Sequence, residues 1–320
     1  MMTKKRVAFL DTARALCMLW IVGIWHMPAY LSYDIQVQNQ FTNYITISVL
    51  ATFTFISGFF LGGGISSFVD VIHFYKKRIK RFYFMFLFSC VSLYVIHLFV
   101  SRVDFIVSVK QLVCTLTGIS CFIAPMPLTI WYFSMMIFFY IITPLVSAQK
   151  TIKSKAIICF VIYAFLVFTN VFLETDDRVV LYFPIYCVAL IMSGSIDIET
   201  NFRLKRFIIA FICCVVATLM NVLWLSNCFT QLVPAISGTV LIIEISKLLT
   251  MKITENTFKK ISYASMCAYL FHRQFLGAIE LILGEISAPT AYCIVMPLFL
   301  VICYYIQKIY DIITDRFVKN

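Results

Sequence analysis

The amino-acid sequence predicts an all-α fold, a polytopic membrane helix bundle with about ten transmembrane helices. Apolar residues make up 62% of the 320 residues and charged residues 13%, whereas typical soluble domains hold about 45–50% and about 25%. The mean hydropathy is +0.94, and a soluble globule of this size has too little interior to bury so many apolar side chains. The apolar runs are long and continuous rather than alternating with period two, which favours helices over an outer-membrane barrel.

Ten stretches approach the roughly 20 mostly apolar residues that a membrane-spanning helix needs. In chain order they lie near residues 7–30, 42–62, 82–100, 128–148, 155–173, 179–195, 205–225, 230–249, 261–283 and 289–309. The sixth stretch is the weakest, because it is short and contains Pro184. The stretch 105–124 is interrupted by Lys110 and Gln111, and we expect it to be re-entrant or interfacial. No loop is long enough to fold alone, so we expect one membrane domain over residues 1–320.

The basic residues predict the orientation of the bundle. When the N-terminus is placed in the cytoplasm, 21 of the 26 Lys and Arg residues fall on the cytoplasmic side. Every second connection is therefore basic, which under the positive-inside rule puts both termini in the cytoplasm of a multi-pass protein of the inner or plasma membrane. The net charge of +11 then reports topology and attraction to anionic lipid head groups, and no nucleic-acid partner is needed to explain it.

Familiar metal, phosphate and nucleophile motifs are absent from the sequence. The twelve cysteines form no C-x-x-C pair and mostly lie inside apolar runs, where they read as small buried hydrophobes. There is no G-x-x-x-x-G-K-[ST], no G-x-G-x-x-G, no H-E-x-x-H and no G-x-S-x-G. We therefore expect no metal site.

The first span carries polar residues that are costly in lipid, and each such residue is a candidate functional group. Asp11 and Arg14 are i,i+3 neighbours, and this pair is either a salt bridge at the start of the helix or part of an active site. His26 lies near the other end of the span. A lone His there is either an interfacial residue or a general base, for which imidazole is well suited because it titrates near neutral pH.

Two further clusters stand out. Residues 76–81 read Lys-Lys-Arg-Ile-Lys-Arg, which is either a cytoplasmic lipid anchor or a site for a phosphate-rich molecule. In the second case Arg78 and Arg81, three residues apart, would aim their guanidinium groups the same way if the stretch is helical. His272 lies within the ninth span and needs a polar partner or a cavity. Glu244 is one turn from Lys247 and is expected to pair with it.

Five motifs follow one another along nearly the whole chain and resemble those of the acyltransferase 3 family of membrane-bound acyltransferases. They are Leu10-Asp11-x-x-Arg14 leading to His26, Phe53-x-Phe55-Ile56-Ser57-Gly58-Phe59-Phe60-Leu61, Arg78-x-x-Arg81, Trp131-Tyr132-Phe133 with Tyr140-Ile141-Ile142-Thr143-Pro144-Leu145, and Ser262-Tyr263-Ala264-Ser265 with Tyr269-Leu270-Phe271-His272. The resemblance implies transfer of an acyl group, commonly acetyl from acetyl-CoA, to a carbohydrate or a lipid-linked sugar at the outer face.

The resemblance also implies roles for individual residues. His26 corresponds to the catalytic His of the family and Arg14 to its partner. Arg78 and Arg81, together with the neighbouring Lys77, correspond to the donor site for acyl-CoA. The remaining motif residues would support the site: Asp11, Ser57, Trp131, Tyr269 and His272.

The chain departs from the family pattern at three places. Eleven residues rather than ten separate Arg14 from His26, and twelve steps of 100° would place the two about 120° apart on an ideal helix. Either a π-bulge absorbs the extra residue, or these side chains do not face one cavity. The proline that often follows the second Arg is missing at Phe82, and residues 134–137 hold no carboxylate.

Other functions stay open at this point. A transporter or flippase for a sugar or a polyanionic substrate would also explain ten spans, buried charges and a basic inner rim, but it predicts inverted repeats with broken helices. Pro184 and Pro234 interrupt two spans without forming a matched pair. A membrane scaffold would leave the polar residues of the first span without purpose. For the enzyme, direct attack by the acceptor and a transient acyl-His intermediate are both possible.

Overall fold

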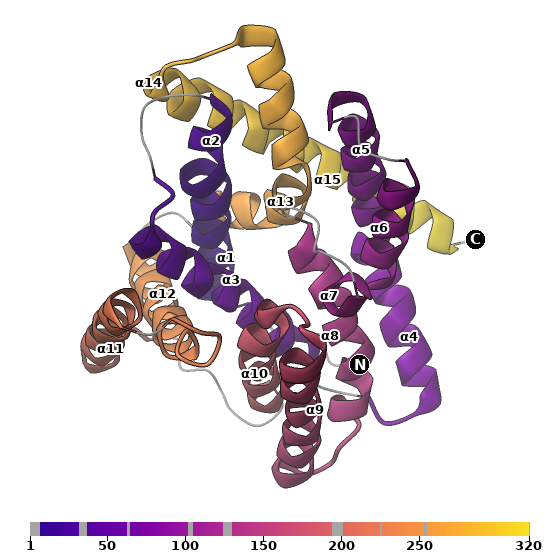
Figure 1. Ribbon diagram of the computed structural model, residues 1–320, viewed down its shortest axis with the longest axis vertical. Coiled ribbons are helices and arrows are strands. Elements are labelled where there is room, and N and C mark those ends of the chain that lie inside the picture. Colours follow the sequence, from indigo (N-terminus) through magenta and orange to yellow (C-terminus); the bar gives the residue numbers. More distant parts are fainter. Residues whose placement is uncertain are drawn as a thin grey trace. The chain divides into compact units, whose positions relative to one another are not determined.

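The computed structural model describes residues 7–31, 37–62, 65–101, 105–123, 130–193, 201–224, 226–252 and 255–319 (Figure 1). Every regular element in these ranges is a helix, and they contain no strand. The predicted all-α fold class is therefore confirmed. The chain divides into two compact units, which we call the middle unit, residues 54–197, and the terminal unit, residues 4–53 with 198–320. The single membrane domain over the whole chain stays a prediction.

The terminal unit is built around the N-terminal helix. Its elements are α1 (Ala8–Leu19), the π-helical segment η1 (Trp20–His26), α2 (Met27–Leu31), the first part of α3 (Gln40–Leu61), α11 (Leu204–Leu223), α12 (Leu232–Lys252), α13 (Glu255–Leu283), α14 (Ala288–Thr290), the π-helical η3 (Ala291–Val295) and α15 (Met296–Lys319). Helix α1 packs against both α12 and α13, and these in turn pack against α11 and α15. The central position of α1 explains why its side chains are mostly buried.

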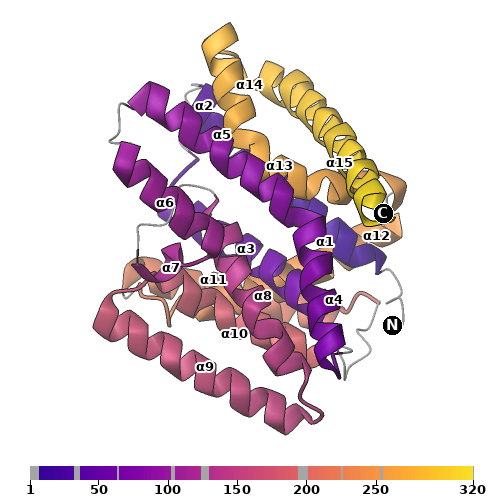
Figure 2. The ribbon, with the colours of Figure 1, turned by 90° about the vertical axis from the view of Figure 1, so that its right-hand side faces the viewer.

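The middle unit begins with the last part of α3. Its other elements are α4 (Phe68–Arg78), the π-helical η2 (Ile79–Tyr83), α5 (Phe84–Ser101), α6 (Phe105–Thr117), α7 (Ser120–Ile123), α8 (Trp131–Ser147), α9 (Ile152–Leu173) and α10 (Asp177–Met192). Helix α10 packs against α8 and α9, and α9 lies beside α10 in both ribbon views (Figures 1 and 2). The predicted interfacial stretch 105–124 forms α6 and α7, which are separated by Gly118 at a φ of +75°.

Six helical segments of the described chain are long and apolar enough to cross a membrane. They are Ala8–Ala29, Gln40–Leu61, Ile152–Leu173, Leu204–Leu223, Leu232–Met251 and Ala288–Asp315. In the most apolar part of α9 only 17% of the residues are buried, and in that of α11 only 22%. These helices therefore present apolar side chains outward, as suits contact with lipid. The protein is thus a multi-pass membrane protein. The four other predicted spans are also helical, as α5, α8, α10 and α13, and a total of ten remains a prediction.

A buried ion pair ties α12 to α11 within the terminal unit. Glu244 Oε1 lies 2.9 Å from Lys247 Nζ, and both side chains are almost fully buried. The same oxygen lies 3.0 Å from Arg206 Nε, while Oε2 accepts a hydrogen bond from the main-chain N–H of Arg203. The pairing of Glu244 with Lys247 expected from their spacing is confirmed.

Candidate functional site

The helix that carries Arg14 and His26 changes its winding between them. Residues Trp20–His26 form the π-helix η1, so the π-bulge alternative for the extra residue is confirmed. A π-helix closes i→i+5 hydrogen bonds, which widens the turn to roughly 80–85° per residue instead of 100°. Six α-helical and six π-helical steps then place Arg14 and His26 roughly 0–30° apart. The two side chains therefore leave the helix on nearly the same face.

Side chains from neighbouring elements hold η1 in this form. The hydroxyl of Tyr292 in η3 donates to the main-chain oxygen of Gly23 at 3.0 Å, and Gln38 Nε2 donates to that of Trp25 at 3.0 Å. The indole N–H of Trp20 donates to Thr46 Oγ1 on α3 at 3.0 Å. Since a π-helix departs from the regular i→i+4 pattern, partners of this kind stabilise it. Sequence motifs did not reveal Tyr292 or Gln38, because the two contacts join segments far apart in the chain.

His26 meets a second imidazole in the terminal unit. The ring centroids of His26 and His272 lie 4.8 Å apart with an interplanar angle of 38°. His272 is fully buried, its Nδ1 lies 2.8 Å from the main-chain oxygen of Tyr269, and its Nε2 has no hydrogen-bond partner among the described residues. The Tyr269 ring lies edge-on at 5.9 Å, with Phe53 of α3 beyond it at 6.3 Å. Three residues singled out from the sequence thus form one cluster.

Asp11 and Arg14 lie on α1, and Asp11 is tied to α13. The Ser262 hydroxyl donates to Asp11 Oδ1 at 2.9 Å, which links the first and last motifs of the chain. One residue further along, Thr12 and Thr250 of α12 share a hydrogen bond of 2.8 Å between their hydroxyls. Asp11 therefore helps to anchor α1 between α12 and α13.

The second candidate group belongs to the middle unit and lies at the end of α4. Arg78 is half-buried, its guanidinium carbon lies 5.7 Å from the centre of the Phe74 ring, and its Nε is enclosed without a hydrogen-bond partner among the described residues. Burial lowers the pKa of Arg78 and Arg81 lowers it further, whereas the hydroxyls of Tyr140 and Tyr186 act in the opposite direction. The Arg78 side chain is therefore packed partly against protein, beside the Phe74 ring.

Arg81 and Lys77 are both exposed. Because Arg81 lies in the π-helix η2, three steps of roughly 80–85° separate it from Arg78 by about 105–120° rather than by the 60° of an α-helix. The two arginines are thus splayed, one half-buried and one exposed, and do not aim the same way as predicted for a regular helix. Burial lowers the pKa of Lys77, and the nearby charges of Arg78 and Arg81 lower it further. Lys77, Arg78 and Arg81 are therefore close enough for their positive charges to interact.

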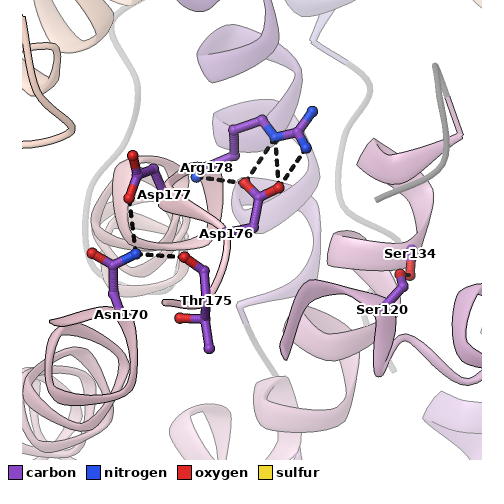
Figure 3. A network of polar contacts seen from close by, with 7 residues as sticks. All are labelled: Ser120, Ser134, Asn170, Thr175, Asp176, Asp177 and Arg178. Carbon is purple, nitrogen blue, oxygen red and sulfur yellow. Dashed lines mark hydrogen bonds and ion pairs between the residues drawn. The ribbon is translucent and has the colours of Figure 1, made fainter. Parts of the chain in front are cut away.

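Trp131 begins α8, where a cation and a second aromatic ring contact it. The guanidinium carbon of Arg178 lies 4.2 Å from the centre of the Trp131 ring, and the Tyr182 ring stacks at 6.1 Å. Arg178 forms an ion pair with Asp176, and the Asp176 carboxylate also accepts from the Arg178 main-chain N–H to cap α10 (Figure 3). The sequence analysis missed this pair, although the Asp-Asp at the start of a helix is a typical N-terminal signal.

Residues 134–137, which follow the Trp motif and hold no carboxylate, begin with Ser134, whose buried hydroxyl pairs with that of Ser120. Ser134 Oγ lies 2.7 Å from Ser120 Oγ (Figure 3) and donates to the Thr115 main-chain oxygen at 3.1 Å. This pair is a structural contact between α7 and α8. Three carboxylates of the middle unit line an open hollow of about 540 Å³ between the end of α9 and the start of α10. Its lining residues are Asn170, Glu174, Thr175, Asp176, Asp177 and Arg178.

Ser57 is half-buried in the last part of α3, beside a close helix contact. A Cβ added to the adjacent Gly58 would lie 2.8 Å from the main-chain oxygen of Tyr186 in α10, so the two helices touch through backbone atoms. Ser57 is thus placed within the middle unit, as are the cationic residues and Trp131, while the imidazole cluster, Asp11 and Arg14 belong to the terminal unit.

Comparison with known proteins agrees with the resemblance of the motifs. The model of the acyltransferase 3 family, described as an acyltransferase domain, matches residues 7–308, nearly the whole chain. Among curated proteins and among solved structures no match was found. With its spanning helices and this match, the chain belongs to the acyltransferase 3 family and is an acyltransferase of the membrane.

Proposed function

We propose that this protein is a membrane O-acetyltransferase that moves an acetyl group from cytoplasmic acetyl-CoA to a hydroxyl of an extracytoplasmic polysaccharide or of its lipid-linked precursor. The observation that carries the proposal is the contact between His26 and the fully buried His272 in a chain of this family. The proposal includes ten spans with both termini in the cytoplasm of an inner or plasma membrane. The family match favours this function over a transporter.

Acetyl transfer from a thioester to a hydroxyl needs a base for the hydroxyl proton and hydrogen-bond donors for the developing oxyanion. An imidazole is the side chain best suited to be the base near neutral pH, so we assign this role to His26. Arg14 leaves the same helix face at most about 18 Å away along the axis. Its guanidinium would line the route by which the acyl group reaches His26. Direct attack by the acceptor hydroxyl needs only these groups, so we prefer it to an acyl-His intermediate.

The donor would bind at Lys77, Arg78 and Arg81. Burial and, second to it, repulsion by Arg78 and Arg81 lower the pKa of Lys77, and an anion bound among these cations would relieve the repulsion. The enclosed, unpartnered Nε of Arg78 is a ready donor for such a ligand, and guanidinium groups bind phosphate oxygens with strong charge-assisted hydrogen bonds. Acetyl-CoA supplies the phosphates and the thioester. The partners of the protein would then be membrane lipids, acyl-CoA and a carbohydrate, with no nucleic acid and no metal.

Acetyl transfer tests the catalytic role. Purified protein in lipid nanodiscs is incubated with radiolabelled acetyl-CoA and the surface polysaccharide of the cells that make it. We expect transfer by the wild-type protein and a loss of at least about 100-fold in His26→Ala, the range typical for a general base. His73→Ala is the matched control, because His73 is exposed on α4 and has no assigned role. A His26→Ala protein that inserts normally and acetylates at the full rate would exclude His26 as the base.

Binding of acetyl-CoA tests the donor site separately. Each hydrogen bond to a charged group contributes about 1.5–3 kcal/mol, so Arg78→Ala is expected to weaken binding roughly 10-fold to 100-fold, and Arg78→Ala/Arg81→Ala more. Lys153→Ala removes a positive charge from α9 that is exposed, as Arg81 is, and should change little. Unchanged affinity in the double variant would make the cluster a lipid anchor.

A further inference from the structure

His272 has a defined tautomer. The side chain is fully buried, and Nδ1 lies 2.8 Å from the main-chain oxygen of Tyr269, almost one turn earlier in α13. A carbonyl oxygen only accepts hydrogen bonds, so Nδ1 must carry the proton. In the neutral ring the lone pair is then on Nε2, which makes this nitrogen an acceptor held in place by the backbone of α13.

The acceptor nitrogen of His272, Nε2, accepts no hydrogen bond from the described residues. Nε2 of His272 is buried and has no hydrogen-bond partner among the described residues. An unsatisfied buried polar atom costs stability, and each one in a folded protein requires an explanation. The His26 ring lies beside it, with 4.8 Å between the ring centroids. A hydrogen bond between a His26 nitrogen and Nε2 requires only a rotation of the His26 ring about χ2, which is a broad torsion in His.

We infer that His26 and His272 form a dyad in which His272 is the positioning residue. Its Nε2 accepts a hydrogen bond from one N–H of His26, so that the other nitrogen of His26 is unprotonated and points at the acceptor hydroxyl. The main-chain oxygen of Tyr269 holds His272 in turn. The chain of contacts follows the logic of a Ser-His-Asp triad, in which a third group fixes the tautomer and orientation of the catalytic His. The inference rests on the proposed function.

The reaction then balances as follows. The O–H bond of the acceptor breaks and its proton goes to His26, while the oxygen forms a bond to the thioester carbonyl carbon. The C–S bond breaks, and the CoA thiolate takes from His26 the proton that came from the acceptor hydroxyl and leaves as the thiol. His272 keeps its Nδ1 proton throughout and stabilises the His26 imidazolium through Nε2. Aromatic rings of Tyr269 and Phe53 line this region, and hydrogen bonds are stronger in such surroundings than in water. Arg273, the next residue on α13, lies within electrostatic range of both imidazoles.

Two substitutions separate positioning from packing. His272→Phe keeps an aromatic ring of similar size but removes both nitrogens, and we expect kcat to fall about 100-fold with an unchanged KM for acetyl-CoA. His272→Gln keeps an acceptor near the place of Nε2, and we expect kcat within about 10-fold of the wild-type value. If His272 only fills space, the Phe variant stays active and the Gln variant loses more, which would overturn the inference. Thermal unfolding in detergent checks that both variants are folded.

A double variant tests whether His272 acts through His26. Residues that act as a unit lose activity non-additively, so His26→Ala/His272→Phe should be no slower than His26→Ala alone. Losses that multiply would show two independent roles and contradict the dyad. This comparison requires that the wild-type protein transfers acetyl groups, and a wild-type protein without transfer would instead refute the proposed function.

The tautomer can be measured without any activity. The chain has only four histidines, so ¹⁵N-labelling of histidine gives a simple NMR spectrum, and the signals of His272 are those that disappear in His272→Gln. The dyad requires the proton of His272 on Nδ1. A proton on Nε2 would remove the acceptor and refute the inference, whatever the activity of the protein.

Discussion

Replacing Glu244 by Gln is expected to destabilise the protein strongly, because it leaves a buried cation without its counter-charge. Glu244 and Lys247 are 2% and 3% exposed and are joined by a contact of 2.9 Å. Arg206 adds a second cation at 3.0 Å from the same oxygen. Gln keeps the shape of the side chain but removes the negative charge. Lys247 would then lie buried in an environment where water cannot compensate its charge.

The size of the effect follows from the burial. Breaking a buried ion pair by removing one partner costs about 3–5 kcal/mol, which lowers the folded-to-unfolded ratio roughly 100-fold to several thousand-fold at 1.4 kcal/mol per tenfold change. Replacing both partners by uncharged residues avoids the isolated charge. We therefore expect Glu244→Gln/Lys247→Met to be more stable than Glu244→Gln alone.

The cysteines of the chain provide the assay. Most are buried, so a thiol-reactive fluorophore reports their exposure as the detergent-solubilised protein is heated. The control is Asp176→Asn, which removes the charge of a partly exposed pair with Arg178, whose side chains are 18% and 37% exposed, and should cost at most about 1 kcal/mol. If Glu244→Gln unfolds at the same temperature as Asp176→Asn, the reasoning from burial is wrong.

Three further predictions concern local structure. Gly58→Ala should lower the unfolding temperature, because its Cβ would lie 2.8 Å from a main-chain oxygen of α10, whereas Gly277→Ala meets nothing within 4 Å and should leave it unchanged or raise it; equal effects would contradict the close contact. Hydrogen bonds lower the pKa of Asp70 from 3.8 to about 2. The largest contribution comes from the Ser66 main-chain N–H, followed by the hydroxyls of Ser67 and Ser66. Stability from this cap of α4 is thus present above about pH 4 and lost as the pH falls through about 2, which hydrogen exchange of the first turn measures, and Asp70→Asn should abolish this dependence. Tyr292→Phe removes the hydroxyl that donates to the Gly23 oxygen, so acetyl transfer should fall while acetyl-CoA binding does not; a normal transfer rate would show that η1 forms without this bond.

Much of the fold could be predicted, because lipid leaves the backbone few choices. Apolar runs of about 20 residues must be helical when no water is present to satisfy main-chain groups, and each of the ten predicted stretches is helical in the described residues. The pair of Glu244 with Lys247 could also be predicted from a spacing of three residues on one helix. Local spacing was sufficient in both cases.

Contacts between distant segments could not be predicted in the same way. The motif resemblance named both His26 and His272, yet it gave no reason for them to touch, because 246 positions separate them in the chain. The free Nε2 of His272 depends on the direction of a side chain toward its own helix backbone, which no spacing reveals. The expectation that Arg78 and Arg81 aim the same way used the α-helical angle, which does not apply to the π-helical residues Ile79–Tyr83.

The π-helices link these observations. A π-helical segment is rare, and such segments often occur at functional sites. Here η1 lies between Arg14 and His26 and η2 begins directly after Arg78, so both interrupt regular helices at residues to which the family resemblance assigns catalysis or donor binding. In η1 the wider turn offsets the one extra residue and returns His26 to the face of Arg14. Deleting one residue of η1 should therefore be tolerated better than inserting one, since deletion allows a regular α-helix with about 20° between the two side chains, whereas insertion turns His26 away from that face.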